Sequence, residues 1–258
     1  MTLPTPYYHD ERAGMTIYHG DCIGTMRGMP DRSIDLICTD PPYGLNFNNG
    51  DLASQREKVF GGKQENLGVR PIANDGEEEA MALFENFLRE AARLLKPGAC
   101  CCCCCCGGGG PKPLFAKWTL LMDEYIGFKH AVVWDKGGMG MGIHYRRNYE
   151  FVLIAQKGQP AHRWNGGNKT TNVWRIPKII PSAKQHPTEK PIELMMKIIS
   201  IHANAGDVVL DPFAGHGSTL EAARRVGCGC IGIELEESYC EIAARRLGQE
   251  VFNFGESK

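Results

Sequence analysis

The sequence predicts an α/β protein whose core is a seven-stranded, mostly parallel sheet, with helices on both faces and one antiparallel hairpin. Seven short apolar runs have the length and composition of buried strands: residues 16–19, 34–39, 99–106, 130–134, 149–156, 207–212 and 230–234. Most of these runs alternate with helical patterns or turn signals. Such alternation is typical of parallel strands joined by crossover helices.

Four segments have apolar residues at helical spacing: residues 84–95, 192–202, 218–226 and 238–247. We expect the first helix to be ended by Pro97 and Gly98, and the second to begin after Pro191, because proline suits a helix's first turn. The connector DKGGMGMGIHYRRN, between the fourth and fifth strands, is rich in glycine and lacks a helical pattern. These two strands are therefore expected to form the hairpin.

The composition fits one α/β domain spanning residues 1–258. With 43% hydrophobic and 23% charged residues, the chain is neither fibrous nor generally disordered. We see no signal peptide and no apolar run near the roughly 20 residues of a membrane span, so we expect a cytoplasmic protein with no membrane partner. Residues 45–76 are polar and glycine-rich, which is typical of a mobile loop or lid.

Cysteine is unusually frequent, and seven of the twelve cysteines are consecutive, from Cys100 to Cys106. Neighbouring residues of a strand point to opposite faces, so this run cannot present one chelating cluster. We interpret these cysteines as small hydrophobic residues of a strand covered on both sides, in preference to a metal or redox site. No metal is expected, and so many thiols require a reducing compartment.

The charge is unevenly distributed. The chain has a net charge of −1, yet the segment from His144 to Lys190 holds nine basic and two acidic residues. A basic segment in an otherwise acidic protein suggests a surface that faces phosphate groups, although a merely solvated surface is the alternative.

A glycine-rich turn follows the strand VVLD in VVLDPFAGHGST, residues 208–219. Gly215 and Gly217 permit a sharp turn and let a ligand approach the backbone closely. The next strand, CIGIE, ends at Glu234, and an acidic residue about 20 positions after such a turn suits the hydroxyls of a ribose. The pattern indicates a nucleoside-containing cofactor, while GxGxxG and the phosphate-loop motif are both absent.

The stretch ICTDPPYG ends an apolar strand with Asp40, Pro41, Pro42 and Tyr43. The amino group of adenine or cytosine is a poor nucleophile, because its lone pair is delocalised into the ring. An enzyme that alkylates this group must accept both of its hydrogens, and the Asp40 side chain and the Pro41 carbonyl supply two acceptors. Neither proline carries a competing N–H, and Tyr43 offers a face on which the base can stack. The alternative is a strand simply stopped by two prolines.

Five motifs together give the sequence a family resemblance: HGD at 19–21, DPPY at 40–43, HPTEKP at 186–191, DPFAGHGST at 211–219 and IGIE at 231–234. In this order the chain resembles the amino-group DNA methyltransferases that use S-adenosylmethionine, of the circularly permuted β-type. The resemblance covers residues 15–247 and implies the methyltransferase sheet. In this family DPPY, as opposed to SPPY, favours adenine N6 over cytosine N4. Glutamine methyltransferases use NPPY and carry the cofactor motif first, which counts against them.

The resemblance also implies a cofactor site. Glu234 would hold the ribose hydroxyls, and Asp21 and Cys22 would border the adenine ring. The expected cofactor-binding residues are Asp21, Cys22, Thr188, Lys190, Asp211, Phe213, Gly215, Gly217, Ser218, Thr219 and Glu234. For Thr188 and Lys190 the alternative is that they merely begin a helix.

In the family, target recognition lies between the last hairpin strand and HPTEKP, which leaves only residues 158–185 here. Recognition is then of a small site, or is shared with residues 45–76 or with a second subunit. The candidate DNA contacts are Arg146, Arg147, Arg163, Lys169 and Arg175, any of which could be plain surface.

Our leading hypothesis is a site-specific DNA adenine-N6 methyltransferase that acts on a base flipped out of double-stranded DNA. The proton shed after transfer goes to Asp40 or to water. The alternatives are methylation of cytosine N4 or of RNA, a non-catalytic nucleic-acid-binding protein, and a nicotinamide oxidoreductase. The recognition sequence, a restriction-modification partner and homodimer formation, which occurs among relatives, are left open.

Overall fold

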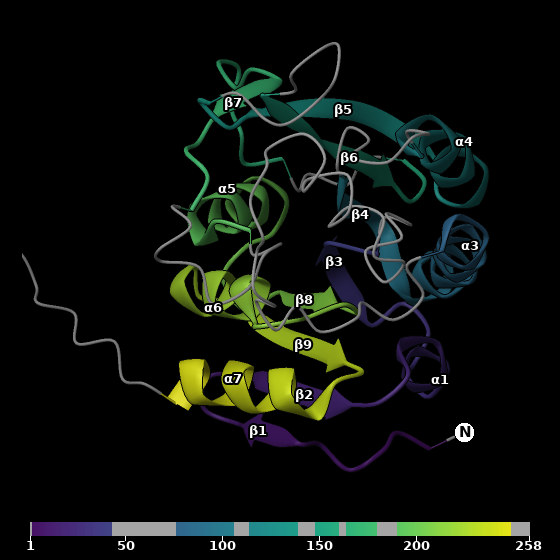
Figure 1. Cartoon of the computed structure of the whole chain (residues 1–258), viewed down its shortest axis with the longest axis vertical. Helices are drawn as coiled ribbons and strands as arrows, with labels where there is room; N and C mark the ends of the chain where they lie inside the picture. The colour runs from purple at the N-terminus through teal and green to yellow at the C-terminus, as the bar shows by residue number, and fades with distance from the viewer. Residues whose placement is uncertain are drawn as a thin grey trace, which may run out of the picture.

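The computed structural model describes residues 2–42, 76–105, 114–138, 148–159, 164–179 and 190–248. One twisted sheet runs through the whole molecule, with the strand order β1-β2-β9-β8-β3-β4-β6-β5-β7 (Figure 1). The strands are β1 (Tyr8–Asp10), β2 (Met15–His19), β3 (Ile34–Thr39), β4 (Leu95–Cys105), β5 (Phe128–Asp135), β6 (Tyr149–Gln156), β7 (Val173–Arg175), β8 (Val208–Asp211) and β9 (Gly229–Glu234).

The predicted architecture is confirmed, but the strand count was too low. All seven expected strands are present, and two three-residue strands, β1 and β7, extend the sheet at its two edges. The centre is parallel, since β2, β9, β8, β3 and β4 pair in this manner. The expected hairpin is the antiparallel pair of β5 and β6. Strands of three residues are too short to show an alternating pattern, which explains why both edges were missed.

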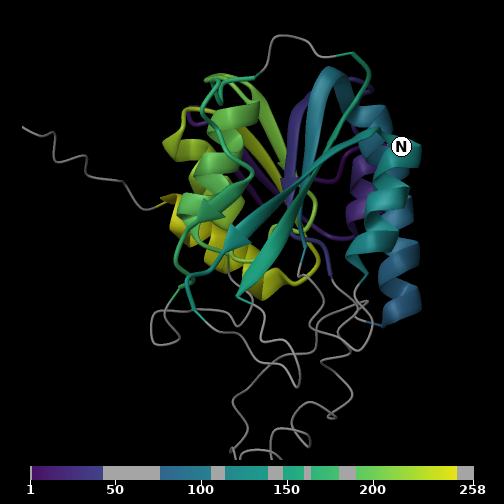
Figure 2. The same cartoon turned by 90° about the horizontal axis from the view of Figure 1, so that it is seen from above.

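Helices cover both faces of the sheet (Figure 2). On one face lie α1 (Cys22–Arg27), α3 (Glu77–Leu94) and α4 (Phe115–Tyr125), and on the other lie α5 (Ile192–His202), α6 (Ser218–Arg225) and α7 (Glu237–Gly248). Each group buries its apolar residues against the sheet, so the sheet separates two hydrophobic cores. Within the described ranges, no helix is both long and apolar enough to cross a bilayer.

The junction between α3 and β4 differs from the expectation. Helix α3 begins at Glu77, seven residues before the predicted start, with three glutamates in its first turn, and it ends at Leu94. Strand β4 begins at the next residue, so Pro97 and Gly98 interrupt the strand and do not end the helix. The pairing of β3 with β4 shifts register here, and Gly98, at φ +81°, donates its N–H to the carbonyl of Lys157. A bulge therefore accommodates the proline.

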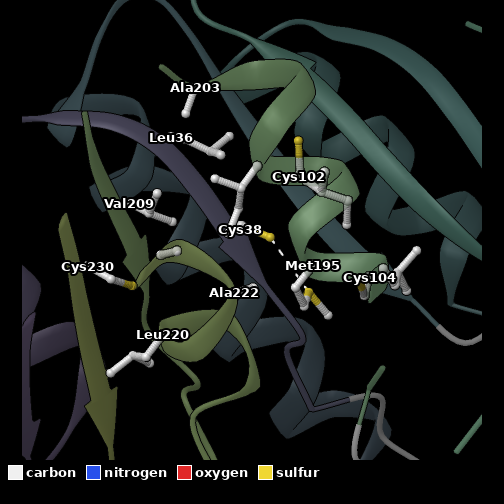
Figure 3. Packing of buried hydrophobic residues seen from close by; sticks show 14 of the residues in the cluster. Leu36, Cys38, Cys102, Cys104, Met195, Ala203, Val209, Leu220, Ala222 and Cys230 are labelled. Atoms are coloured by element: carbon white, nitrogen blue, oxygen red, sulfur yellow. Dashed lines mark hydrogen bonds between the residues drawn. The ribbon is translucent and has the colours of Figure 1, made fainter. Parts of the chain in front are cut away.

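Cys100 to Cys105 of the cysteine run lie in β4, and the described side chains pack as apolar residues do. Cys100 to Cys104 are buried free thiols, and they alternate between the two cores. Figure 3 shows Cys38 of β3 pointing toward Met195 of α5, with 3.8 Å between the two sulfur atoms. Burial raises the pKa of the Cys38, Cys102 and Cys104 thiols well above the ordinary value, which keeps them protonated and unreactive. The described residues contain no His, Cys, Asp and Glu cluster that could hold a metal.

Candidate active site

The candidate site lies where the winding of the sheet reverses. Strand β3 continues through α3 to β4 on one side, whereas β8 continues through α6 to β9 on the other, with the two helices on opposite faces. Ligands of open α/β sheets bind beyond the carboxyl ends of the strands at this switch point. Asp40 follows β3, Asp211 ends β8 and Glu234 ends β9, so the topology brings all three predicted acids to one edge.

Thr39 and Asp211 join the two strands at the switch point. The Thr39 hydroxyl donates to Asp211 Oδ1 at 2.6 Å, and the Phe213 N–H donates to the same oxygen at 3.1 Å. Both side chains are buried. Burial raises the pKa of Asp211, and hydrogen bonds from Thr39, Thr219 and Phe213 oppose that rise. The Asp211 carboxylate, predicted to bind cofactor, is thus largely engaged in holding the ends of β3 and β8 together.

Among the described residues, a side chain donates to only one of the two carboxylate oxygens of Asp40. Its Oδ2 accepts from the Lys190 ammonium at 2.6 Å. Its Oδ1 is buried and has no hydrogen-bond donor among the described residues. Burial raises the pKa of Asp40 to about 7, although the charge and hydrogen bond of Lys190 pull it down. A buried acceptor without a donor is costly for a folded protein, and its presence at a sheet edge suggests a ligand with an N–H or O–H.

Lys190 contacts a second carboxylate. Its Nζ lies 3.7 Å from Glu150 Oε2, and Glu150 Oε1 in turn lies 3.0 Å from the Nζ of Lys136. Lys190 was expected near the cofactor, and in the structure its ammonium lies against the predicted catalytic aspartate. Glu150 is the second residue of β6 and Lys136 follows β5, so the hairpin contributes to the site.

The glycine-rich turn (residues 212–217) uses its two glycines differently. Gly215 has φ +49°, and a β-carbon built on it would meet nothing within 4 Å. Gly217 has φ +78°, and its β-carbon would lie 3.0 Å from Ala243 Cβ of α7. Gly217 therefore permits α6 and α7 to approach each other, whereas Gly215 leaves open space in front of the backbone. That space is where a ligand could approach closely.

Glu234 is fastened to this turn. Its Oε2 accepts from the Gly215 N–H and its Oε1 from the Glu236 N–H, both at 2.8 Å. Burial raises the pKa of Glu234, and these backbone donors counteract part of the rise. Each carboxylate oxygen retains a lone pair, so the side chain can still accept from a pair of hydroxyls.

Asp21 and Cys22, which were expected to border the adenine ring, directly follow the strand that pairs with β9 at Glu234. His19 pairs with Glu234 in the register of β2 and β9, and the Gly20 N–H donates to the Glu234 carbonyl at 2.9 Å. The Asp21 side chain caps α1 by accepting from the Gly24 N–H at 2.6 Å. Burial raises the pKa of the Cys22 thiol to about 12, so this side chain acts as an apolar wall.

Phe213, Ser218 and Thr219 surround the turn. The ring of Phe213 makes an edge contact with Phe87 of α3, with centroids 5.7 Å apart. The Ser218 hydroxyl accepts from Arg246 at 3.3 Å, and Thr219 is buried against Asp211. The turn is thus held by helices from both faces of the sheet.

Several predicted residues lie outside the described ranges: Tyr43, Arg146, Arg147, Arg163 and Thr188, with most of residues 45–76 and part of 158–185. Among the DNA-contact candidates that are described, Lys169 and Arg175 are exposed. Two cations of the basic segment are used internally, because Lys190 binds Asp40 and Lys157 donates to the Leu95 carbonyl at 2.7 Å.

Thr39, Glu150, Lys136 and Phe87 were not predicted as site residues. The sequence contained one usable signal, since Glu150 is one of only two acids in the basic segment and is the second residue of an expected strand. The contacts of Thr39 and Phe87 depend on strand order, which no local pattern encodes.

The fold and the site define the class: a doubly wound α/β protein with an acidic strand end, a glycine-rich turn and a buried carboxylate at one sheet edge. Comparison with known families then identifies the family to which the chain belongs. A family model described as DNA methylase matches residues 34–245, so the chain belongs to the DNA methylase family.

Curated relatives and solved structures agree with this membership. The chain is 26% identical to the Type II methyltransferase M2.MboI of Moraxella bovis, covering 93% of this chain and 90% of the relative. It is 28% identical to the DNA adenine methyltransferase YhdJ of Escherichia coli strain K12, covering 90% and 82%. The structure of the M1.HpyAVI–SAM complex superimposes with a TM-score of 0.65 at 26% identity, covering 91% of this chain and all of that one. The cytosine-N4-specific PvuII DNA methyltransferase reaches 0.69 at 18% identity, covering 93% and 88%, and shows the shared fold alone.

Proposed function

We propose that this protein is a DNA methyltransferase that transfers a methyl group from S-adenosylmethionine to the N6 amino group of adenine. The observation that carries the proposal is the buried Asp40 Oδ1, which lacks a donor among the described residues and lies at the same sheet edge as the glycine-rich turn. An adenine amino group supplies the missing N–H. The choice of adenine is supported by DPPY and by the names of relatives such as the adenine methyltransferase YhdJ.

The residues around the turn fit the cofactor. Glu234 has lone pairs left for the ribose hydroxyls, Gly215 leaves space for close approach, and Asp21 and Cys22 border the position of the adenine ring. Phe213 extends the wall of this site. When bound, the cofactor supplies an electrophilic methyl group on a sulfonium. A structure of M1.HpyAVI, one of the similar proteins, is titled as its complex with SAM.

The residues after β3 prepare the substrate nitrogen. Asp40 Oδ1 accepts one hydrogen of the amino group and the Pro41 carbonyl accepts the other, which favours the tetrahedral nitrogen that attacks the methyl group. Tyr43 stacks against the base. After transfer, the nitrogen carries one proton too many. Because its pKa is about 7, the Asp40 carboxylate can take up that proton at neutral pH.

The DNA substrate is double-stranded, and the target adenine must leave the helix to reach Asp40. Exposed Lys169 and Arg175 are proposed to contact phosphates, together with Arg146, Arg147 and Arg163. The recognition region at 158–185 is short, so a homodimer could add the second surface that recognition requires. Action on DNA, and the many free thiols, suit the cytoplasm.

The test is mass spectrometry of nucleosides from DNA incubated with the protein and methyl-deuterated S-adenosylmethionine. We expect labelled N6-methyldeoxyadenosine from the wild type and none from Asp40→Ala, with cofactor binding retained in that variant. Glu124→Ala, at an exposed position of α4, serves as the control. Labelled N4-methyldeoxycytidine would replace the proposed target, and full activity of Asp40→Ala would reject the mechanism.

A further inference from the structure

Four side chains form a row of alternating charge beside the candidate site: Asp40, Lys190, Glu150 and Lys136. Successive charged atoms are separated by 2.6 Å, 3.7 Å and 3.0 Å. The residues come from four chain segments, namely the ends of β3 and β5, the start of β6 and the residue before Pro191. Such convergence over the end of β4 depends on the folded sheet.

The row is largely removed from water. Lys190 is 6% exposed, and the side chains of Glu150, Lys136 and Asp40 are 14%, 18% and 20% exposed. Charges in such surroundings influence one another more strongly than they do at the surface. A buried ammonium is tolerated only when carboxylates compensate it, and here two carboxylates share the Lys190 charge.

Lys136 and the hairpin hold Glu150 so that its carboxylate lies 3.7 Å from the Lys190 ammonium. Its other oxygen is bound by Lys136, and the hairpin holds both residues in place. Trp134 pairs with Glu150 in the register of β5 and β6, and the Lys136 N–H donates to the Asn148 carbonyl at 2.8 Å. Glu150 therefore attracts the ammonium without replacing Asp40 as its nearest partner.

We propose that Glu150 and Lys136 are positioning residues of the methyl-transfer site, which divide the Lys190 ammonium between two carboxylates and so leave Asp40 a strong hydrogen-bond acceptor. The proposal rests on the function proposed above. An aspartate whose charge is fully neutralised by one lysine holds the substrate amino group less tightly. Sharing the lysine makes the ionised Asp40 carboxylate more basic, so its Oδ1, which has no donor among the described residues, accepts a hydrogen bond more strongly.

The proposal fixes the direction of three shifts in the pKa of Asp40. Replacing Glu150 by Gln removes a neighbouring negative charge that raises the pKa of Asp40 and attracts Lys190, so the pKa of Asp40 falls. Lys190→Met removes the nearest positive charge, so the pKa rises. Lys136→Met removes the other cation that binds Glu150, so Glu150 attracts Lys190 more strongly and the pKa of Asp40 rises by a smaller amount. Asp211 of β8 and the buried thiols of β3 and β4 also face Asp40, and these variants leave them unchanged.

The experiment is a carbon-13 NMR titration of aspartate carboxyls in the cofactor-free protein, with the Asp40 signal assigned from Asp40→Asn. We expect a rise of about one pH unit or more for Lys190→Met, because an opposite charge this near shifts a carboxyl by about 1–3 units. For Glu150→Gln we expect a fall of about half a unit, with a several-fold lower methyl-transfer rate and an unchanged KM for cofactor. Lys129→Met and Glu124→Gln, both at exposed positions, are the matched controls.

An unchanged or raised Asp40 pKa in folded Glu150→Gln would overturn the proposal. Lys190→Arg keeps the charge and should titrate like the wild type, which provides a second test if Lys190→Met does not fold. The titration needs no methyl transfer. If the shifts appear but the wild type methylates no DNA, the proposed function fails while the charge sharing stands.

Discussion

Gly215 provides a sharp test of the cofactor site, because its replacement should cost affinity more than stability. At φ +49° an alanine is strained by about 1–2 kcal/mol, but its methyl group meets no protein atom within 4 Å. The free energy of unfolding should therefore fall by about 1 kcal/mol in urea titrations. The added methyl group projects into the proposed cofactor position, so the Kd for S-adenosylmethionine should rise at least tenfold, or about 1.4 kcal/mol, by calorimetry.

Gly217→Ala is the matched comparison. Its φ of +78° imposes similar strain, and its methyl group would also lie 3.0 Å from Ala243 Cβ, closer than ordinary carbon–carbon contact. We expect about 2–4 kcal/mol of lost stability, because overpacking adds about 1–3 kcal/mol. The reasoning is refuted if Gly215→Ala binds cofactor like the wild type, or if Gly217→Ala is as stable as Gly215→Ala.

Three further predictions follow from the site. The pKa of Asp40 is raised to about 7, so its carboxylate becomes protonated as the pH falls. Single-turnover methyl transfer should therefore be lost below about pH 7 and reach its plateau above about pH 8. A rate that stays constant from about pH 5.5 to about pH 9 contradicts this prediction. Thr39→Val removes a hydrogen bond to the buried Asp211 carboxylate, so the free energy of unfolding measured by denaturant titration should fall by about 2 kcal/mol. A fall of less than about 0.5 kcal/mol would mean that this hydrogen bond does not stabilise the fold. Glu234→Gln removes the negative charge and places an amide NH₂ against one of the two backbone N–H groups that donate to Glu234. The cofactor affinity measured by calorimetry should therefore fall about tenfold or more. An unchanged Kd would exclude Glu234 as the ribose ligand.

The elements with clear patterns were predicted closely. Strands 34–39 and 149–156 have the expected bounds, and the helix at 192–202 matches α5. Helix α4 was missed although Trp118 and Met122 have the i, i+4 spacing of its buried face, because it follows a glycine- and proline-rich stretch that reads as a loop. Helix α1, with six residues, is too short for periodicity to reveal.

The motifs placed the acids of the site correctly at strand ends, because the carboxyl ends of parallel strands share one edge. They did not reveal how these acids are partnered. Lys190 binds an aspartate 150 positions earlier, and Asp211 accepts from a threonine 172 positions away. Such pairings depend on strand order and on side-chain direction, which a single sequence does not specify. For the same reason, the sequence did not reveal that Glu150 lies close to Lys190.

The central claim is that Asp40 and Glu234 serve one site, and a crystal structure of the protein with the cofactor analogue sinefungin tests it most directly. We predict ribose hydroxyls within hydrogen-bond distance of Glu234, and the amine that replaces the sulfonium methyl directed toward the side of the sheet edge that carries Asp40. An analogue bound away from Glu234, or with its amine directed away from Asp40, would contradict the claim.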